Sequence, residues 1–136
     1  MLFRQDRCIG AGRSVFLLVK KTLPPSAYNL TDYSAQAFED SIWCSIPITY
    51  QKSMLFGCLY RSPSSTATND AYLEALFNEV SEASLDFRVI VGDFNCPKID
   101  WENMFSTSTN KFLLDCCQNN FLSQVVESPT RDDNIL

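Results

Sequence analysis

The sequence predicts an α+β or layered α/β domain, and three observations lead to this fold class. Apolar runs of strand length alternate along the chain with segments of helical periodicity. Two of these runs, 40–50 and 54–61, are separated by a short turn, which is typical of an antiparallel pair. The composition, 46% hydrophobic and 20% charged in 136 residues, is that of one globular domain.

The first half of the chain is predicted to form strands and a loop. The run at 13–21 is apolar, ends in two lysines and is followed by a Pro-Pro pair, which predicts a buried strand. Residues 26–38 are polar and mixed, which predicts a loop with at most a short strand. Apolar and polar residues alternate in 40–50, so a half-buried strand is expected there, and Pro47 indicates an edge or a bulge. The almost continuously apolar run at 54–61 predicts a strand buried on both faces.

A helix and another strand are predicted next. Asp70 is a suitable N-cap, and apolar residues follow it at helical spacing, so we expect a helix that runs to about Ser84. The residues on its apolar face are Tyr72, Leu73, Leu76, Phe77 and Val80. The β-branched run at 87–91 then predicts a strand that leads directly into the sequence Gly-Asp-Phe-Asn-Cys-Pro.

The last third of the chain predicts a loop, a helix and a strand. Residues 97–105 have the composition of a loop, and a helix is expected to begin at Ser108 or Thr109. Its inner face would carry Phe112, Leu113, Cys116 and Cys117. Residues 121–126 predict a strand, and 129–136 are turn-like and then apolar again.

Composition excludes several functional classes. A net charge of −5 is the wrong sign for gripping nucleic acid by bulk charge, so such a contact needs local groups or a divalent cation. The chain has no histidine, which excludes Ser-His-Asp and Cys-His nucleophile sets and mixed zinc sites within it. Six cysteines without a Cys-x-x-Cys pair predict reduced thiols and an intracellular location. No apolar run approaches membrane-spanning length, so no membrane contact is expected.

The most informative stretch is the strand end at 89–97, which contains Asp93 and Asn95. These residues are two apart, so on an extended backbone their side chains point to the same side. A carboxylate and a carboxamide placed in this way can orient a water molecule and hydrogen-bond a phosphoryl oxygen. The alternative is a strand followed by an Asx turn, since Asp and Asn are common turn residues, and the motif alone leaves both interpretations open.

An ordered series of motifs carries a family resemblance. It consists of Tyr-Arg-Ser-Pro at 60–63, Gly-Asp-Phe-Asn at 92–95, Ile-Asp-Trp at 99–101 and Glu-Ser-Pro-Thr-Arg at 127–131. This series resembles the endonuclease/exonuclease/phosphatase family, and more narrowly the apurinic-type endonuclease domain of non-LTR retrotransposon reverse-transcriptase polyproteins. The resemblance implies a two-layer β-sandwich flanked by helices.

The resemblance also implies a chemistry, the hydrolysis of DNA phosphodiesters with Mg²⁺ or Mn²⁺ and without a small-molecule cofactor. Tyr60 matches the family tyrosine that hydrogen-bonds the scissile phosphate. Asp93 matches the aspartate that orients or deprotonates the attacking water, and it could contribute to metal binding through water or indirectly. Asn95 matches the asparagine that stabilises charge on the phosphoryl oxygens. Arg61 is a candidate for binding a substrate phosphate, with pairing to a carboxylate as its structural alternative.

Some family features are expected outside these residues. The metal-site asparagine and glutamate would precede Met1, and the Ser-Asp-His strand end would follow Leu136. We therefore expect 1–136 to be the central portion of one domain, incomplete at both ends and inactive alone.

The leading functional hypothesis is the DNA-nicking endonuclease domain of a non-LTR retrotransposon, acting inside the cell with the nucleus as a candidate compartment. The alternative is a non-catalytic relic, or a binding or scaffold module derived from that domain. A third hypothesis, a phosphoinositide or another phosphodiester as substrate, is disfavoured by the Tyr-Arg-Ser-Pro and Ile-Asp-Trp motifs.

Overall fold

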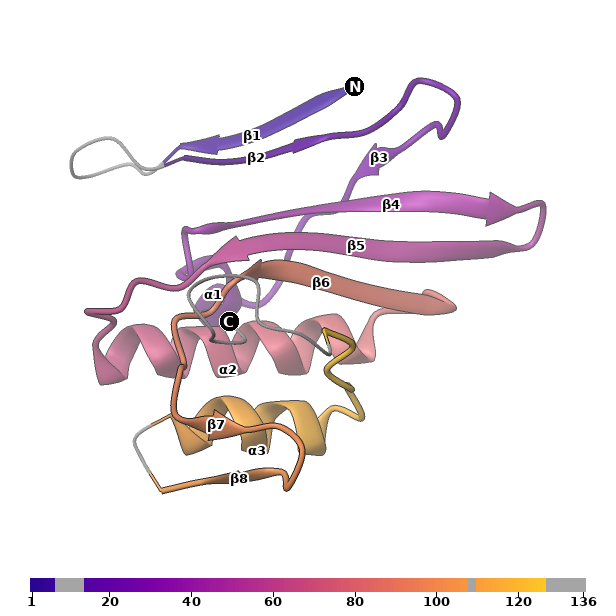
Figure 1. Ribbon diagram of the computed structural model, residues 1–136. Helices are drawn as coiled ribbons and strands as arrows, with labels where there is room; N and C mark the ends of the chain where they lie inside the picture. Colours follow the sequence, from indigo (N-terminus) through magenta and orange to yellow (C-terminus); the bar gives the residue numbers. More distant parts are fainter. Residues whose placement is uncertain (7–13, 108–109, 127–136) are drawn as a thin grey trace.

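A four-stranded sheet forms the centre of the molecule (Figure 1). The computed structural model describes residues 1–6, 14–107 and 110–126. The strands of the sheet lie in the order β3 (Ser26–Ala27), β4 (Ser41–Thr49), β5 (Lys52–Tyr60) and β6 (Phe87–Asp93). The predicted mixed α and β architecture is confirmed.

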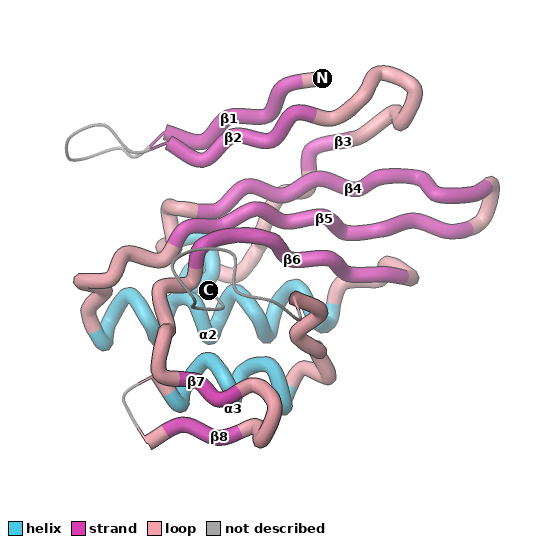
Figure 2. Tube along the Cα trace, viewed as in Figure 1, coloured by secondary structure: helices cyan, strands magenta, loops and turns pink. Residues whose placement is uncertain are grey.

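The sheet separates two layers of different kinds. A hairpin of β1 (Leu2–Asp6) and β2 (Ser14–Leu18) lies over one face, whereas α2 (Ala67–Glu82) and α3 (Lys111–Asn119) lie on the other side (Figure 2). A single helical turn, α1 (Tyr33–Gln36), packs beside α2. The predicted arrangement of two β layers flanked by helices is therefore present in the described part of the chain.

Strand pairing brings the ends of β5 and β6 together. β4 and β5 are antiparallel, as predicted, and their register shifts between Pro47 and Thr49, where a bulge was one of the two expectations. β6 runs parallel to β5, with Met54 opposite Phe87 at one end and Tyr60 opposite Asp93 at the other. A parallel pair needs a crossover connection, and α2 supplies it.

The prediction of a half-buried strand at 40–50 is wrong for its central residues. Trp43 is buried on the helix side, and Cys44 and Ile46 are buried beneath the hairpin. The alternation arises because the strand meets two different layers, so both of its faces lose contact with water. The strand at 54–61 is fully buried at Leu55 and Leu59, which face the helices, and only partly buried on the hairpin side.

The main core lies between the sheet and the helices. Its largest fully buried side chains belong to β5, α2, α3 and the segment after α1, namely Leu55, Leu59, Leu73, Leu76, Val80, Leu113 and Phe38. The predicted apolar face of α2 is thus confirmed at its centre. In α3, Leu113 and Cys116 are buried as predicted, and Leu114 joins them.

Helix α2 begins earlier than predicted, because Thr66 is its N-cap. The Thr66 hydroxyl accepts a hydrogen bond from the backbone N–H of Asn69 at 3.2 Å. Asp70, the predicted cap, lies within the first turn and faces Arg61. A threonine hydroxyl can accept the capping hydrogen bond as well as a carboxylate can, so residue type alone does not decide between Thr66 and Asp70 as the N-cap.

Replacing the cap should have a modest cost. We expect Thr66→Ala to lower the free energy of unfolding by about 1 kcal/mol, because one backbone N–H of α2 loses its acceptor. Thr68→Ala is the matched control, since Thr68 is exposed within the same first turn and caps nothing. Urea unfolding of both variants measures the difference, and equal stabilities would contradict the assignment of Thr66 as the cap.

Two predictions for connecting segments need correction, and two short elements were not expected. The strand predicted at 121–126 is wrong, because Phe121 has a positive φ of 54° and residues 122–126 have no regular secondary structure. The loop at 97–105 contains β7 (Ile99–Asp100), which pairs with β8 (Phe105–Ser106). Neither β1 nor α1 was predicted as a regular element, and α1 is only one turn long.

Other predictions concern residues that the structure does not describe. The helix start at Ser108 or Thr109 and the turn at 129–136 lie outside the described residues. Among the residues that are described, no helix is long and apolar enough to cross a membrane.

Candidate active site

Tyr60 and Asp93 lie side by side at the ends of two neighbouring strands. They are opposite each other in the β5–β6 ladder, and the next backbone N–H, that of Arg61, donates to the carbonyl oxygen of Asp93 at 2.8 Å. Both side chains are half-buried. Parallel pairing thus places a phenol and a carboxylate from distant parts of the sequence at one rim of the sheet.

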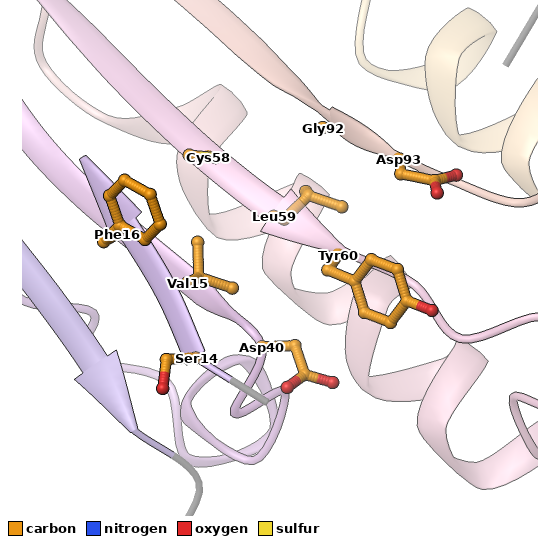
Figure 3. A pocket seen from close by; sticks show the side chains of 9 residues that line it. All are labelled: Ser14, Val15, Phe16, Asp40, Cys58, Leu59, Tyr60, Gly92 and Asp93. Atoms are coloured by element: carbon orange, nitrogen blue, oxygen red, sulfur yellow. The ribbon is translucent and has the colours of Figure 1, made fainter. Parts of the chain in front are cut away.

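These two residues line a pocket of about 550 Å³ between β2 and the ends of β5 and β6 (Figure 3). Its lining consists of Ser14, Val15, Phe16, Asp40, Cys58, Leu59, Tyr60, Gly92 and Asp93. Figure 3 shows the Tyr60 hydroxyl and the Asp93 carboxylate pointing toward the same side, with the Asp40 carboxylate across the Tyr60 ring. One wall of the pocket is apolar and its rim is acidic.

Gly92 allows β5 and β6 to approach closely beside the pocket. A Cβ atom at this position would collide with the backbone carbonyl oxygen of Leu59, its partner in the ladder. Because the obstructing atom belongs to the backbone of a neighbouring strand, it cannot move as a side chain could. The absence of a side chain at residue 92 is therefore a condition for placing Asp93 beside Tyr60.

Asn95 lies beyond the strand in a tight turn. Its φ of 49° is in the left-handed region, and its backbone N–H donates to Oδ1 of Asp93 at 3.1 Å, which is an Asx turn. The expectation that alternation would place Asp93 and Asn95 on the same side is wrong, because β6 ends at Asp93. The Asn95 Nδ2 donates to the backbone carbonyl of Arg61 at 2.8 Å, and Asn95 does not line the pocket.

Arg61 points into the protein. Its side chain is 7% exposed, and Nε and Nη2 bind the Asp70 carboxylate at 2.8 and 2.9 Å. Nη1 donates to the backbone carbonyls of Phe94 at 3.3 Å and Asn95 at 3.2 Å. The hydrogen bond to Asp70 raises the pKa of Arg61 above its ordinary value, so this guanidinium is always charged. Of the two roles considered from sequence, the structure displays pairing with a carboxylate.

Asp40 is a site residue that sequence reasoning missed. It is 7% exposed, lines the same pocket as Tyr60 and Asp93, and its backbone carbonyl accepts the N–H of Tyr60 at 2.9 Å. In the sequence, nothing but its place at the start of a predicted strand distinguishes it. Once 40–50 and 54–61 are paired as a hairpin, an acidic residue that opens the first strand must lie beside the residue that closes the second.

The donor atoms at the rim suit a hard divalent cation in part. Carboxylate oxygens are the preferred ligands of Mg²⁺, which commonly binds one or two carboxylates and keeps several waters. Asp93 provides such an oxygen at the pocket. Within residues 1–6, 14–107 and 110–126, no group of three His, Cys, Asp or Glu side chains could hold a metal ion. The described residues therefore fit a partial coordination shell.

Burial disfavours the reactive thiolate of the cysteines, and it raises the pKa of Cys58, which lines the pocket. The five that are described are free thiols, and Cys8 lies outside the described residues. Burial raises the pKa of Cys96 and Cys117 to about 11 and that of Cys116 to about 12. These thiols are protonated near neutral pH, and the reactive form of cysteine is the thiolate.

The Ile-Asp-Trp segment supports the core from the loop. Ile99 is buried and Trp101 is packed against the main core. Its indole Nε1 is buried and has no hydrogen-bond partner among the described residues. The last motif of the predicted series, residues 127–131, lies outside the described part of the chain.

A family model described as endonuclease-reverse transcriptase matches residues 54–134, a segment that contains Tyr60, Asp93 and Asn95. No curated protein matches the chain.

Among solved structures, the fold is similar to the endonuclease domain of TRAS1, a telomere-specific non-LTR retrotransposon, with a TM-score of 0.57 and 12% identity. The match covers 88% of this chain and 52% of that one, so the chain spans about half the length of the solved structure. At this level of identity the likeness concerns the fold alone.

Proposed function

Because the chain belongs to the endonuclease-reverse transcriptase family, we propose that it contributes to a divalent-metal-dependent phosphodiesterase, the DNA-nicking endonuclease domain of a non-LTR retrotransposon. The observation that carries the proposal is the pairing of Tyr60 with Asp93 at the rim of one pocket. The fold similarity to the TRAS1 endonuclease domain supports it. We place the activity inside the cell, with chromosomal DNA in the nucleus as the candidate substrate.

The residues at the pocket rim and in the turn after β6 divide the work of hydrolysis. The Asp93 carboxylate orients the attacking water and accepts its proton. As a general base, it must lie within hydrogen-bond reach of that water. The Tyr60 hydroxyl donates to a non-bridging oxygen of the scissile phosphate. The Asn95 amide has two N–H donors, one of which is given to Arg61, and the second is the donor we propose for the phosphoryl oxygens.

A divalent cation, Mg²⁺ or Mn²⁺, would be held by Asp93 through water or indirectly. When bound, it would polarise the phosphoryl group and neutralise charge that develops on its oxygens. It would also reverse the local sign of a protein whose net charge is −5, which DNA would otherwise avoid. The carboxylate of Asp93 is the only predicted metal ligand among the described residues.

The proposal is tested by plasmid nicking. We expect the 136-residue chain alone to leave supercoiled plasmid intact with Mg²⁺, because it has no histidine and its described residues hold no three-ligand metal site. We expect the chain expressed with its in-frame flanking sequence to nick, and Asp93→Ala to lower that rate about a hundredfold. EDTA should abolish the nicking.

The matched control is Asp86→Ala, just before the other end of β6, where the carboxylate accepts the backbone N–H of Ser53. Its nicking rate should equal that of the wild type. Robust Mg²⁺-dependent nicking by the isolated chain that Asp93→Ala removes would contradict the expected inactivity. If Asp93→Ala left the nicking rate of the extended protein unchanged, the role assigned to Asp93 would be overturned.

A second candidate function is a non-catalytic relic or a binding module derived from such a domain. It is favoured by the lack of histidine in the sequence. Reading the flanking coding sequence in frame discriminates between the two. An upstream Asn and Glu with a downstream Ser-Asp-His and a reverse-transcriptase block support the enzyme, whereas stop codons on both sides support the relic.

A further inference from the structure

We propose that Arg61 is a positioning residue, which holds the turn that carries Asp93 and Asn95 from the protein side and does not bind the substrate phosphate. The proposal rests on the proposed function, since it concerns the residues assigned to that chemistry. Arg61 immediately follows Tyr60, yet its side chain points to the interior and is only 7% exposed.

The guanidinium joins the turn to helix α2 through both of its edges. One edge, Nε and Nη2, binds the two oxygens of Asp70 at 2.8 and 2.9 Å. The remaining nitrogen, Nη1, donates to the carbonyl oxygens of Phe94 at 3.3 Å and Asn95 at 3.2 Å. Of the common side chains, only arginine offers this planar set of donors to a carboxylate and two carbonyls at once.

The connection between Arg61 and the turn is reciprocal. The Asn95 side chain donates to the Arg61 carbonyl at 2.8 Å, and the Arg61 backbone N–H donates to the Asp93 carbonyl at 2.8 Å. Asn95 has a φ of 49°, a conformation that L-residues adopt only at some cost in free energy. The contacts with Arg61 offset that cost, and they fix where the Asn95 amide and the Asp93 carboxylate lie.

A second layer of contacts holds Arg61 and Asp70 in place. The Ser65 hydroxyl donates to Oδ1 of Asp70 at 2.7 Å, and the Asn69 amide donates to the Ser65 oxygen at 3.0 Å. On α3, the ring of Phe112 lies 5.2 Å from the guanidinium carbon of Arg61. The N-terminal end of α2 and the first turn of α3 therefore both set the position of the catalytic turn.

Arg61→Lys is the direct test in the 136-residue chain. Lysine keeps the charge but cannot span the Asp70 carboxylate and both carbonyls. We expect backbone amide resonances of residues 93–95 to shift, and hydrogen exchange of the Asn95 amide to rise about tenfold. Arg88→Lys is the matched control, because Arg88 lies in β6, the strand that ends at Asp93, and donates to the carbonyls of Val80 and Ala83 at the far end of α2.

The comparison is made relative to global stability, measured for both variants by urea unfolding. If Arg61→Lys changes residues 93–95 no more than Arg88→Lys does, the positioning role is overturned. Should Arg61→Lys fail to fold, Ser65→Ala provides the test, because the Ser65 hydroxyl donates to the Asp70 carboxylate that binds Arg61. Ser65→Ala should shift the Asn95 amide in the folded protein, and an unchanged resonance would again overturn the proposal.

Kinetics separate positioning from phosphate binding in any longer protein that contains this chain and nicks DNA. A positioning residue predicts that Arg61→Lys lowers kcat about tenfold with KM unchanged, whereas a phosphate contact predicts that KM rises. The spectroscopic outcome does not depend on nicking. An altered turn in a protein that never cuts DNA would therefore support the positioning role of Arg61 while the proposed function fails.

Discussion

Replacing Asp70 by alanine should lower the free energy of unfolding by about 4 kcal/mol, because it leaves the Arg61 guanidinium buried without its carboxylate. The two side chains are 7% and 17% exposed, so water cannot replace the lost oxygens. Arg61 also donates to the carbonyls of Phe94 and Asn95, so its displacement would disturb the turn. Urea unfolding followed by circular dichroism measures the loss.

The matched control is Asp115→Ala, which breaks an exposed ion pair with Lys111 one turn away on α3. That change should cost about 0.5 kcal/mol or less, since exposed pairs contribute little. The double variant Asp70→Ala with Arg61→Met removes both charges and should be more stable than Asp70→Ala alone. An Asp70→Ala protein as stable as Asp115→Ala would show that the pair does not hold the fold.

Gly92→Ala should destabilise the protein by about 3 kcal/mol, since the new methyl group meets a backbone carbonyl that cannot rotate away. Relief of the clash requires β6 to move from β5, and that movement separates Tyr60 from Asp93. We therefore expect loss of the tertiary structure at the site together with the loss of stability. Thermal unfolding measures the second, and amide resonances of Tyr60 and Asp93 measure the first.

Val91→Ala changes the residue before Gly92 and is the control for the loss of stability expected from Gly92→Ala. Val91 is 39% exposed, so its truncation should cost about 1 kcal/mol or less. If Gly92→Ala were tolerated as well as Val91→Ala, the close approach of the two strands at Leu59 would not be a requirement of the fold.

Local pattern was sufficient to predict the elements that make the sheet. The apolar runs that became β4, β5 and β6 have the length and composition of strands, and the short turn at Gln51 joins two of them as a hairpin. Tyr60 and Asp93 could each be placed at a strand end for this reason. Their pairing depends on the register between β5 and β6, which no local pattern encodes.

The remaining features depend on partners that are distant in the sequence. The direction of Arg61 is decided by Asp70 and by two carbonyls on another strand end, so a surface role was as reasonable from sequence as a buried one. Asn95 does not continue the predicted alternation, because its backbone N–H donates to the Asp93 side chain and its amide donates to the Arg61 carbonyl. The apolar residues at 121–126 follow a left-handed turn at Phe121, and strand propensity could not foresee it.

The crossover between β5 and β6 has a consequence for the order in which the molecule acquires its parts. Tyr60 lies before α2 and Asp93 after it, so the two meet only when the helix has docked and the parallel ladder has closed. Contacts between residues so far apart in sequence carry a loop-closure entropy and form slowly compared with a hairpin. The β4–β5 hairpin can assemble early during synthesis, whereas the carboxylate and the phenol come together late. On the ribosome, the candidate site could therefore not assemble until the chain through Asn95 had emerged.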